Sequence, residues 1–349
     1  AAVVAATAAN TDHYVGLASS FSAGVIYCSA GTAALVRRRL RVAQDRVRAL
    51  RLLTPTPIRV TLLDANHCPG AVMVLFEMPD GKLHLHVGDF RWDRTAMLAA
   101  SPPLRFLTPL AAGDVPAAAV VAAAAATGPG TAATMAAAAG MAAAGVARRL
   151  DSLYLDTTYC DPRYAFPPQR DAIQAARPRP RPGTLVLFGC YSLGKERLYL
   201  EVAARLGLRV YVEKRRHETM ALLGLPPAVM SLATTDPAAT PLWAVPIGHV
   251  NFRGMKTYTR QPRGALQGNW QRVIGVQPTG WTFRGGGNGL TRRESGGMVL
   301  YGVPYSEHSS FVELRDCVRY FGARRVVPTV GCGTTTKVHD QLRLLGASL

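Results

Sequence analysis

A block of three β-prone runs between residues 61 and 91 constrains the fold of this chain most strongly. The first run ends in the turn that carries His67, and the third ends at Asp89. The first run starts at Thr61, the other two cover residues 71–78 and 83–87, and Pro79-Asp80-Gly81 separates these two. This pattern predicts one histidine and one aspartate at neighbouring strand ends. Imidazole nitrogen and carboxylate oxygen suit zinc and similar divalent metals, which indicates a metallohydrolase site. A buried structural histidine and a turn aspartate are the alternative.

Three further segments place polar side chains at strand ends. A short apolar run at 1–7 leads to Asp12-His13, a strand at 152–155 leads to Asp156, and a strand at 299–303 leads to His308. A helix is expected at 311–321 and a closing strand at 325–330. Repeated strand-end sites of this kind favour one shared metal site over coincidence.

Charge indicates the class of partner. The 349 residues carry a formal net charge of +18, which favours a polyanion such as nucleic acid. A GC-rich genome explains the choice of Arg over Lys but not the size of the surplus. A helix predicted at 31–53 carries several arginines that form either a solvated face or a phosphate-binding surface: Arg37, Arg38, Arg39, Arg41, Arg46, Arg48 and Arg51.

Cysteine usage and hydropathy indicate a compartment. The six cysteines include no C-x-x-C pair, which suggests a reducing environment without a disulfide framework. No strongly apolar run of about 18 residues occurs outside an alanine tract, so we expect an intracellular protein that does not enter the membrane. That tract, residues 99–146, is rich in Ala, Gly and Pro and is predicted to be a low-complexity surface insertion. The alternating Arg-Pro segment at 177–182 is predicted to be a stiff connector.

The loop at 189–196 nearly matches a phosphate-binding Walker A sequence. It follows a predicted strand at 184–188 and precedes a predicted helix at 197–206, but Glu196 stands where a magnesium-binding hydroxyl is required. An ATPase is therefore excluded, while Ser192, Lys195 and the backbone N–H groups of the helix start favour a phosphate pocket. An ordinary capped strand-to-helix turn is the alternative.

These segments together resemble a known family. The sequence is similar to the successive motifs of the DNA cross-link repair nucleases, metallo-β-lactamase/β-CASP proteins that include Artemis and Apollo, over nearly the whole chain. The matching segments are Asp64-Ala65-Asn66-His67-Cys68-Pro69-Gly70-Ala71, Gly88-Asp89-Phe90-Arg91, Leu155-Asp156-Thr157-Thr158-Tyr159-Cys160, Tyr191-Ser192-Leu193-Gly194-Lys195-Glu196 and Pro304-Tyr305-Ser306-Glu307-His308-Ser309-Ser310.

The resemblance implies an α/β fold, a metallo-β-lactamase αββα sandwich that is truncated at the N-terminus and carries an inserted β-CASP domain. The expected boundaries are 1–165 for the first part of the sandwich, 166–297 for the β-CASP domain and 298–349 for the closing part. It also implies a nuclear, zinc-dependent 5′-to-3′ exonuclease that hydrolyses DNA with a 5′-phosphate, in interstrand cross-link or double-strand break repair.

The resemblance also assigns residues. Asp12, His13, Asp89 and His308 correspond to one metal site, His67 and Asp89 belong to the other, and Asp156 orients the ligands; Asp12, His13 and Asp156 are the expected catalytic residues. The 5′-phosphate is assigned to Ser192, Lys195, Ser306 and Ser309. The family's H-x-H-x-D-H loop is degenerate here, because Ala8 and Asn10 replace its first two histidines. We expect one or two bound divalent ions.

Two alternatives follow from these departures. The first is a catalytically impaired relative that still binds DNA, which Ala8 and Asn10 favour. The second is an RNA-processing β-CASP endonuclease, although the Asp-Thr-Thr-Tyr-Cys and Tyr-Ser-x-Gly-Lys-Glu motifs favour the DNA branch. His84 and His86 form an H-x-H pair on one face of a strand, and we predict a structural role for both.

Overall fold

The computed structural model describes most of the chain. The described residues are 2–5, 18–20, 24–50, 59–107, 148–176, 178, 180–259, 262–263, 266–283 and 289–347. They form two compact units, and the second, Pro162–Ser310, is inserted between the two segments of the first, Ala1–Asp161 and Phe311–Leu349. Among the described residues, no helix is long and apolar enough to cross a membrane.

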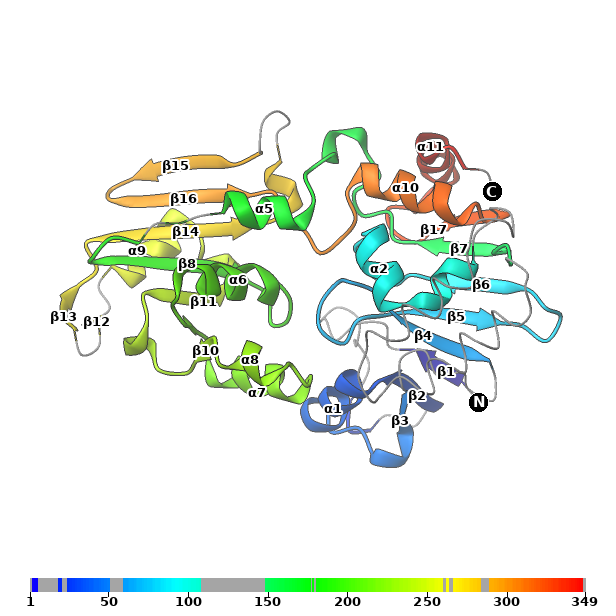
Figure 1. Ribbon diagram of the computed structural model, residues 1–349, viewed down its shortest axis with the longest axis horizontal. Coiled ribbons are helices and arrows are strands. Elements are labelled where there is room, and N and C mark those ends of the chain that lie inside the picture. The colour runs from blue at the N-terminus through cyan, green and yellow to red at the C-terminus, as the bar shows by residue number, and fades with distance from the viewer. Residues whose placement is uncertain are drawn as a thin grey trace. The chain divides into compact units, whose positions relative to one another are not determined.

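The first unit contains two sheets. A three-stranded parallel sheet has the order β1-β2-β3, and a five-stranded mixed sheet has the order β17-β7-β6-β5-β4 (Figure 1). The strands are β1 (Ala2–Ala5), β2 (Gly24–Ser29), β3 (Val47–Leu50), β4 (Val60–Asp64), β5 (Val72–Glu77), β6 (Leu83–His86), β7 (Ser152–Leu155) and β17 (Arg325–Pro328). The helices are α1 (Ala30–Arg39), α2 (Arg94–Ala100), α10 (Phe311–Phe321) and α11 (Thr335–Leu345), with 3-10 turns η1 (Gln44–Arg46) and η2 (Pro102–Phe106).

The five-stranded sheet forms because its strands carry apolar residues on both faces. The first four of the five residues of β4 and of the six of β5 are buried. Val60, Leu62, Val72 and Val74 form one cluster, and Leu50 of β3 packs against it, which joins the two sheets of this unit. Burial of aliphatic side chains at this density is the main stabilising term for such a sheet.

The second unit is a seven-stranded sheet in the order β10-β9-β11-β8-β14-β16-β15, in which only β15 is antiparallel to its neighbour. Its strands are β8 (Thr184–Cys190), β9 (Val210–Tyr211), β10 (Ala233–Thr234), β11 (Leu242–Pro246), β14 (Arg272–Pro278), β15 (Thr291–Ser295) and β16 (Met298–Val303); β12 (Pro262–Arg263) and β13 (Leu266–Asn269) form a separate pair. Its helices are α5 (Gln169–Ala175), α6 (Glu196–Leu206), α7 (Lys214–Leu222), α8 (Pro227–Met230) and α9 (Phe252–Tyr258), with turns η3 (Pro162–Tyr164), η4 (Pro237–Ala239), η5 (Ile247–His249) and η6 (Gly280–Thr282).

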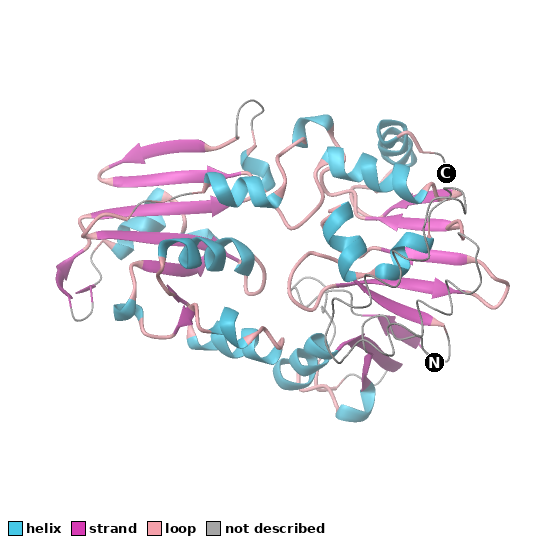
Figure 2. Cartoon of the chain, viewed as in Figure 1, coloured by secondary structure: helices cyan, strands magenta, loops and turns pink. Residues whose placement is uncertain are grey.

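Helices cover both faces of this sheet. All seven residues of β8 are buried, and they alternate between two cores. Val186 and Phe188 pack in the cluster that contains residues of α6, whereas Leu185 and Leu187 pack with Met255 of α9. Figure 2 shows α6 in front of the sheet and α9 behind it. A parallel sheet needs this double cover, because its strands have no solvent-facing side.

The structure corrects three expectations. The predicted helix at 31–53 ends at Arg39, and 47–50 form β3 instead, because this segment pairs with β2. The strand at 298–303 lies in the sheet of the second unit, beside β14, rather than in the closing part of the sandwich. The tract at 99–146 begins as ordered structure, since Ser101, Leu104 and Leu107 are fully buried; residues 108–146 lie outside the described residues.

Candidate metal centre

The strand ends of the first unit bring the predicted site residues to one edge of the five-stranded sheet. β5 is antiparallel to both β4 and β6, and β7 is parallel to β6. β4, β6 and β7 therefore run in the same direction and end at the same edge. His67 follows β4, Asp89 follows β6 and Asp156 follows β7. Side chains gather at such an edge because loops leave the strands there without disturbing the ladder.

The His67 loop is held by hydrogen bonds to the next loop along this edge. Asn66 has a left-handed φ of 49°, and its N–H donates to Asp64 Oδ1 at 2.7 Å, which closes a tight turn. The Asn66 side chain donates to the Arg91 carbonyl at 2.9 Å, and Arg91 N–H donates to the Ala65 carbonyl at 3.0 Å. The loops that carry His67 and Asp89 are thereby tied together at two points.

The Asp89 loop is positioned by His86. The Gly88 N–H donates to His86 Nδ1 at 3.0 Å, and the His86 ring stacks on Tyr154 with ring centroids 5.6 Å apart. Burial lowers the pKa of His86, so the ring stays neutral and its Nδ1 remains an acceptor at neutral pH. These contacts support the structural role predicted for His86. Nδ1 of His84 is buried without a hydrogen-bond partner among the described residues.

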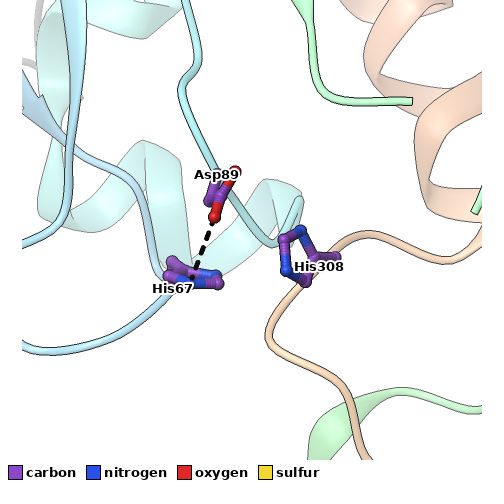
Figure 3. A group of neighbouring side chains, drawn as sticks. All are labelled: His67, Asp89 and His308. Carbon is purple, nitrogen blue, oxygen red and sulfur yellow. Dashed lines mark ion pairs between the residues drawn. The ribbon is translucent and has the colours of Figure 1, made fainter. Parts of the chain in front are cut away.

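Three of the predicted ligands form a group that can hold a metal ion. His67 Nε2 lies 3.8 Å from Asp89 Oδ2, and the ligand atoms of His67, Asp89 and His308 all lie within 4.8 Å of one another (Figure 3). His308 sits in the segment that runs directly into α10, where its N–H donates to Ser306 Oγ at 3.0 Å. Two imidazoles and one carboxylate are a donor set that suits zinc, so the residues present fit a divalent ion.

Asp156 is close to this edge but is engaged by its own turn. Its side chain is buried, and Oδ1 accepts hydrogen bonds from Thr158 N–H at 3.0 Å and from the Thr158 hydroxyl at 2.6 Å. The structure places it outside the three-residue group. Asp12 and His13, like Ala8 and Asn10, lie outside the described residues.

The predicted phosphate-binding lysine is buried and ion-paired in the second unit. Lys195 Nζ lies 3.5 Å from Glu307 Oε2, and Lys195 N–H donates to Glu307 Oε1 at 2.5 Å. The turn requires glycine at 194, because φ is +102° and an added Cβ would lie 2.6 Å from Glu307 Oε2. Ser192 is exposed, whereas Ser306 and Ser309 are buried.

A second buried pair supports the same loop. Glu196 Oε1 accepts hydrogen bonds from Gly194 N–H at 3.1 Å and from Arg216 at 3.2 Å, and Arg216 also donates to the Tyr191 carbonyl. Burial and the nearby Glu307 carboxylate raise the pKa of Glu196 to about 7, although Arg216 opposes the shift. Glu196 thus stabilises this loop through hydrogen bonds, at the position where an ATPase has its magnesium-binding hydroxyl.

The sequence interpretation missed Glu307 and Arg216 as parts of the site. Glu307 stands between Ser306 and His308, so its place in the motif was a usable signal. Arg216 lies on α7, 20 residues beyond Glu196, and no local pattern distinguishes it from the neighbouring Lys214 and Arg215. Only the packing of α7 identifies it.

Comparison with known proteins identifies a matching family model and several similar proteins. The family described as DNA repair metallo-beta-lactamase matches residues 227–334. The chain is 33% identical over 350 residues to the DNA cross-link repair protein SNM1 of Arabidopsis thaliana, covering 96% of this chain and 62% of that protein. It is 32% identical over 344 residues to the DNA cross-link repair 1A protein of Mus musculus, covering 93% of this chain and 28% of that protein.

A third relative extends the same pattern. The 5′ exonuclease Apollo of Gallus gallus is 32% identical over 327 residues, covering 92% of this chain and 57% of that protein. The chain therefore spans less than two thirds of the length of each of these relatives. The predicted α/β metallo-β-lactamase fold class is confirmed by the family match and by the sheets and helices described above. The order of the motifs, the metal-binding group at the strand ends and these similarities relate the chain to the DNA cross-link repair family of metallo-β-lactamase proteins.

Proposed function

We propose that this protein is a metal-dependent DNA repair nuclease, a 5′-to-3′ exonuclease that acts on 5′-phosphorylated ends in interstrand cross-link and double-strand break repair. The group of His67, Asp89 and His308 is the observation that carries the proposal. The names of the relatives support DNA repair and a 5′ exonuclease activity. DNA as the substrate and the nucleus as the compartment follow from the same relatives and agree with the net charge of +18.

Each residue has a proposed role. His67, Asp89 and His308 hold zinc, Asp12 and His13 contribute further ligands, and Asp156 orients the ligands. Asp12, His13 and Asp156 are the proposed catalytic residues. When bound, the ion polarises the phosphoryl group and stabilises developing negative charge. The imidazole of His67 is positioned by the two hydrogen bonds that join its loop to Arg91. Fixed ligand orientation of this kind raises metal affinity.

The terminal phosphate is proposed to bind Ser192 and Lys195 with Ser306 and Ser309. All four belong to the second unit, and the Ser306 carbonyl is anchored by Gln169 at 2.8 Å. An incoming phosphate would share the Lys195 ammonium with Glu307. This arrangement favours a strongly anionic group over a neutral hydroxyl, because the lysine charge is already partly balanced.

A catalytically impaired DNA-binding relative is the second candidate. Ala8 and Asn10 replace two imidazoles of the family motif, and removing ligands weakens a metal site. In this case the basic surface and the Lys195 loop remain, while hydrolysis is lost.

The proposal is tested by measuring metal content and DNA cleavage on one preparation. Single-stranded DNA labelled at its 3′ end is offered with either a 5′-phosphate or a 5′-hydroxyl, and an RNA of the same sequence serves as a third substrate. We expect bound zinc and shortening from the 5′ end that is faster with the phosphate. His67→Ala should lose zinc and reduce cleavage by at least about 100-fold, because a metal ligand is removed.

A matched variant separates the site from general damage. His217 lies on α7, outside the metal-binding group, and His217→Ala should keep both zinc and cleavage. Intact DNA that is still bound by zinc-free protein would favour the DNA-binding relative. Internal cuts in RNA would favour the RNA-processing alternative.

A further inference from the structure

A cavity of about 410 Å³ lies in the first unit, on the side of the five-stranded sheet where β7 and β17 begin. Its lining combines three arginines with apolar residues. We call it the distal arginine pocket and define it by Arg149, Arg315, Arg319, Val318, Val326 and Leu345. No carboxylate lines it, and all of its lining residues are described.

The arginines of α10 face this cavity because the acidic and basic side chains of the helix lie on different faces. Its two acidic residues, Glu313 and Asp316, contact the segment that follows Asp89. Glu313 pairs with Arg91 at 2.7 Å, and Asp316 accepts a hydrogen bond from the Trp92 indole at 2.7 Å. Arg315 and Arg319 are four residues apart, so they lie on one face of the helix, and both are exposed. Carboxylates that could neutralise them are therefore committed elsewhere.

The third arginine is fixed in place. Arg149 Nε donates to the Gly322 carbonyl at 2.7 Å, at the end of α10, which leaves its terminal N–H groups for another acceptor. Asp151 is two residues away but pairs with Arg324 at 3.4 Å and accepts from Leu83 N–H at 2.9 Å. Val318, Val326 and Leu345 form an apolar part of the lining, and all three are buried.

We propose that the distal arginine pocket is a second DNA-binding site that holds backbone phosphates of the duplex away from the cut. This inference rests on the proposed function for its choice of DNA as the anion. Guanidinium groups bind phosphate oxygens bidentately, and phosphate contacts do not depend on base sequence. The pocket lacks aromatic lining residues, so it would bind the backbone rather than stack a base.

The position of the pocket predicts a length dependence. α10 begins three residues after His308, and its 11 residues span about 16 Å before the chain reaches Gly322. At about 3.4 Å per base-pair step, this length corresponds to roughly five steps of duplex. A duplex shorter than this would not span the length of α10, so we expect it not to reach both the metal edge and the pocket.

The test measures DNA binding by fluorescence anisotropy over a range of salt concentrations, in EDTA so that no cleavage occurs. Arg315→Ala/Arg319→Ala is compared with wild type on a duplex of about 30 base pairs and on an oligonucleotide of about four nucleotides. We expect the slope of log affinity against log salt to become shallower by about 2 on the long duplex, near 0.9 for each lost phosphate contact. Binding of the short oligonucleotide should be unchanged.

The matched control removes two arginines that already have carboxylate partners. Arg324 pairs with Asp151 and Arg343 pairs with Asp340, so Arg324→Ala/Arg343→Ala removes the same charge without emptying the pocket. An equal change of slope in both double variants, or an equal loss on short and long DNA, would overturn the proposal. So would an unchanged slope accompanied by tighter binding of an acidic peptide to wild type than to Arg315→Ala/Arg319→Ala.

The two proposals fail separately. Wild-type protein that shows the length-dependent slope but no cleavage after zinc is restored would disprove the nuclease and retain the pocket. Cleavage without the slope difference would disprove the distal arginine pocket as a DNA-binding site and retain the nuclease. Thermal melting of all variants confirms that they are folded.

Discussion

Glu196 shows at the scale of a single residue how the loop before α6 depends on pH. Its carboxyl is fully buried, and its pKa rises from the ordinary 4.5 to about 7, mainly through burial and then through the nearby Glu307. Between these two values the folded protein holds a proton that the unfolded chain has released. Stability therefore falls as pH rises through this window, by at most about 1.4 kcal/mol per pH unit, and is constant above it.

Substitution tests this dependence. Glu196→Gln keeps an acceptor for Arg216 but cannot ionise, so the melting temperature of the variant should vary less between pH 5 and about 7 than that of wild type. Differential scanning calorimetry across that range checks it. Glu201→Gln, on the exposed side of the same helix, is the control and should follow wild type. Parallel profiles for wild type and Glu196→Gln would mean that this carboxyl does not titrate in the folded state.

Single residues also show what the sequence could predict about the site. His67, Asp89 and His308 were identifiable because each follows a β-prone run, and strand direction then brings His67 and Asp89 to one edge of a sheet. The burial of Lys195 against Glu307 was not predictable, because the two residues are 112 positions apart and charge alone does not reveal pairing. Asp12 and His13 remain predictions.

At the scale of elements, strands were predicted well where periodicity was strong. The strands predicted from Thr61 onward and at 71–78, 83–87, 152–155 and 184–188 are confirmed as β4, β5, β6, β7 and β8, with shifts of a few residues at some ends. The helix predicted at 311–321 is confirmed as α10. The helix predicted through 31–53 was wrong after Arg39, because tertiary pairing with β2 overrides the helical tendency of that segment. The sheet to which β16 belongs depends on long-range pairing and could not be assigned from sequence.

The α1 N-terminus provides a prediction at this scale. Ser29 caps α1 by accepting from Thr32 N–H at 3.3 Å, and both hydroxyls lie within 3.1 Å of the Gly70 carbonyl in the His67 turn. Ser29→Ala should cost about 1–2 kcal/mol of stability and also weaken zinc binding. Zinc titration and chemical denaturation measure the two effects.

A second cap is the matched control. Thr334 caps α11 by accepting from Lys337 N–H at 3.3 Å and does not belong to the His67 turn, so Thr334→Ala should cost stability alone. If Ser29→Ala and Thr334→Ala leave zinc affinity equally unchanged, α1 does not support the His67 loop.

For the whole molecule, bound metal should appear as stability. The three ligands are far apart in sequence, so the unfolded chain cannot present them together. Zinc at about 100 times its dissociation constant should raise the free energy of unfolding by about 2.7 kcal/mol. Melting at increasing zinc concentration measures this effect; His67→Ala should not respond, while His217→Ala should respond as wild type does. A zinc response that survives in His67→Ala would place the ion elsewhere.

The inserted second unit has a consequence for synthesis on the ribosome. β7 pairs with β17 through Ser152 and Arg325, which are 173 residues apart, and the whole second unit is translated between them. At about 5–20 residues per second, the nascent chain would hold the β7 edge unpaired for roughly 10–35 seconds. An open strand edge of this duration is a hazard for aggregation, so we expect the nascent chain to depend on chaperones until β17 emerges.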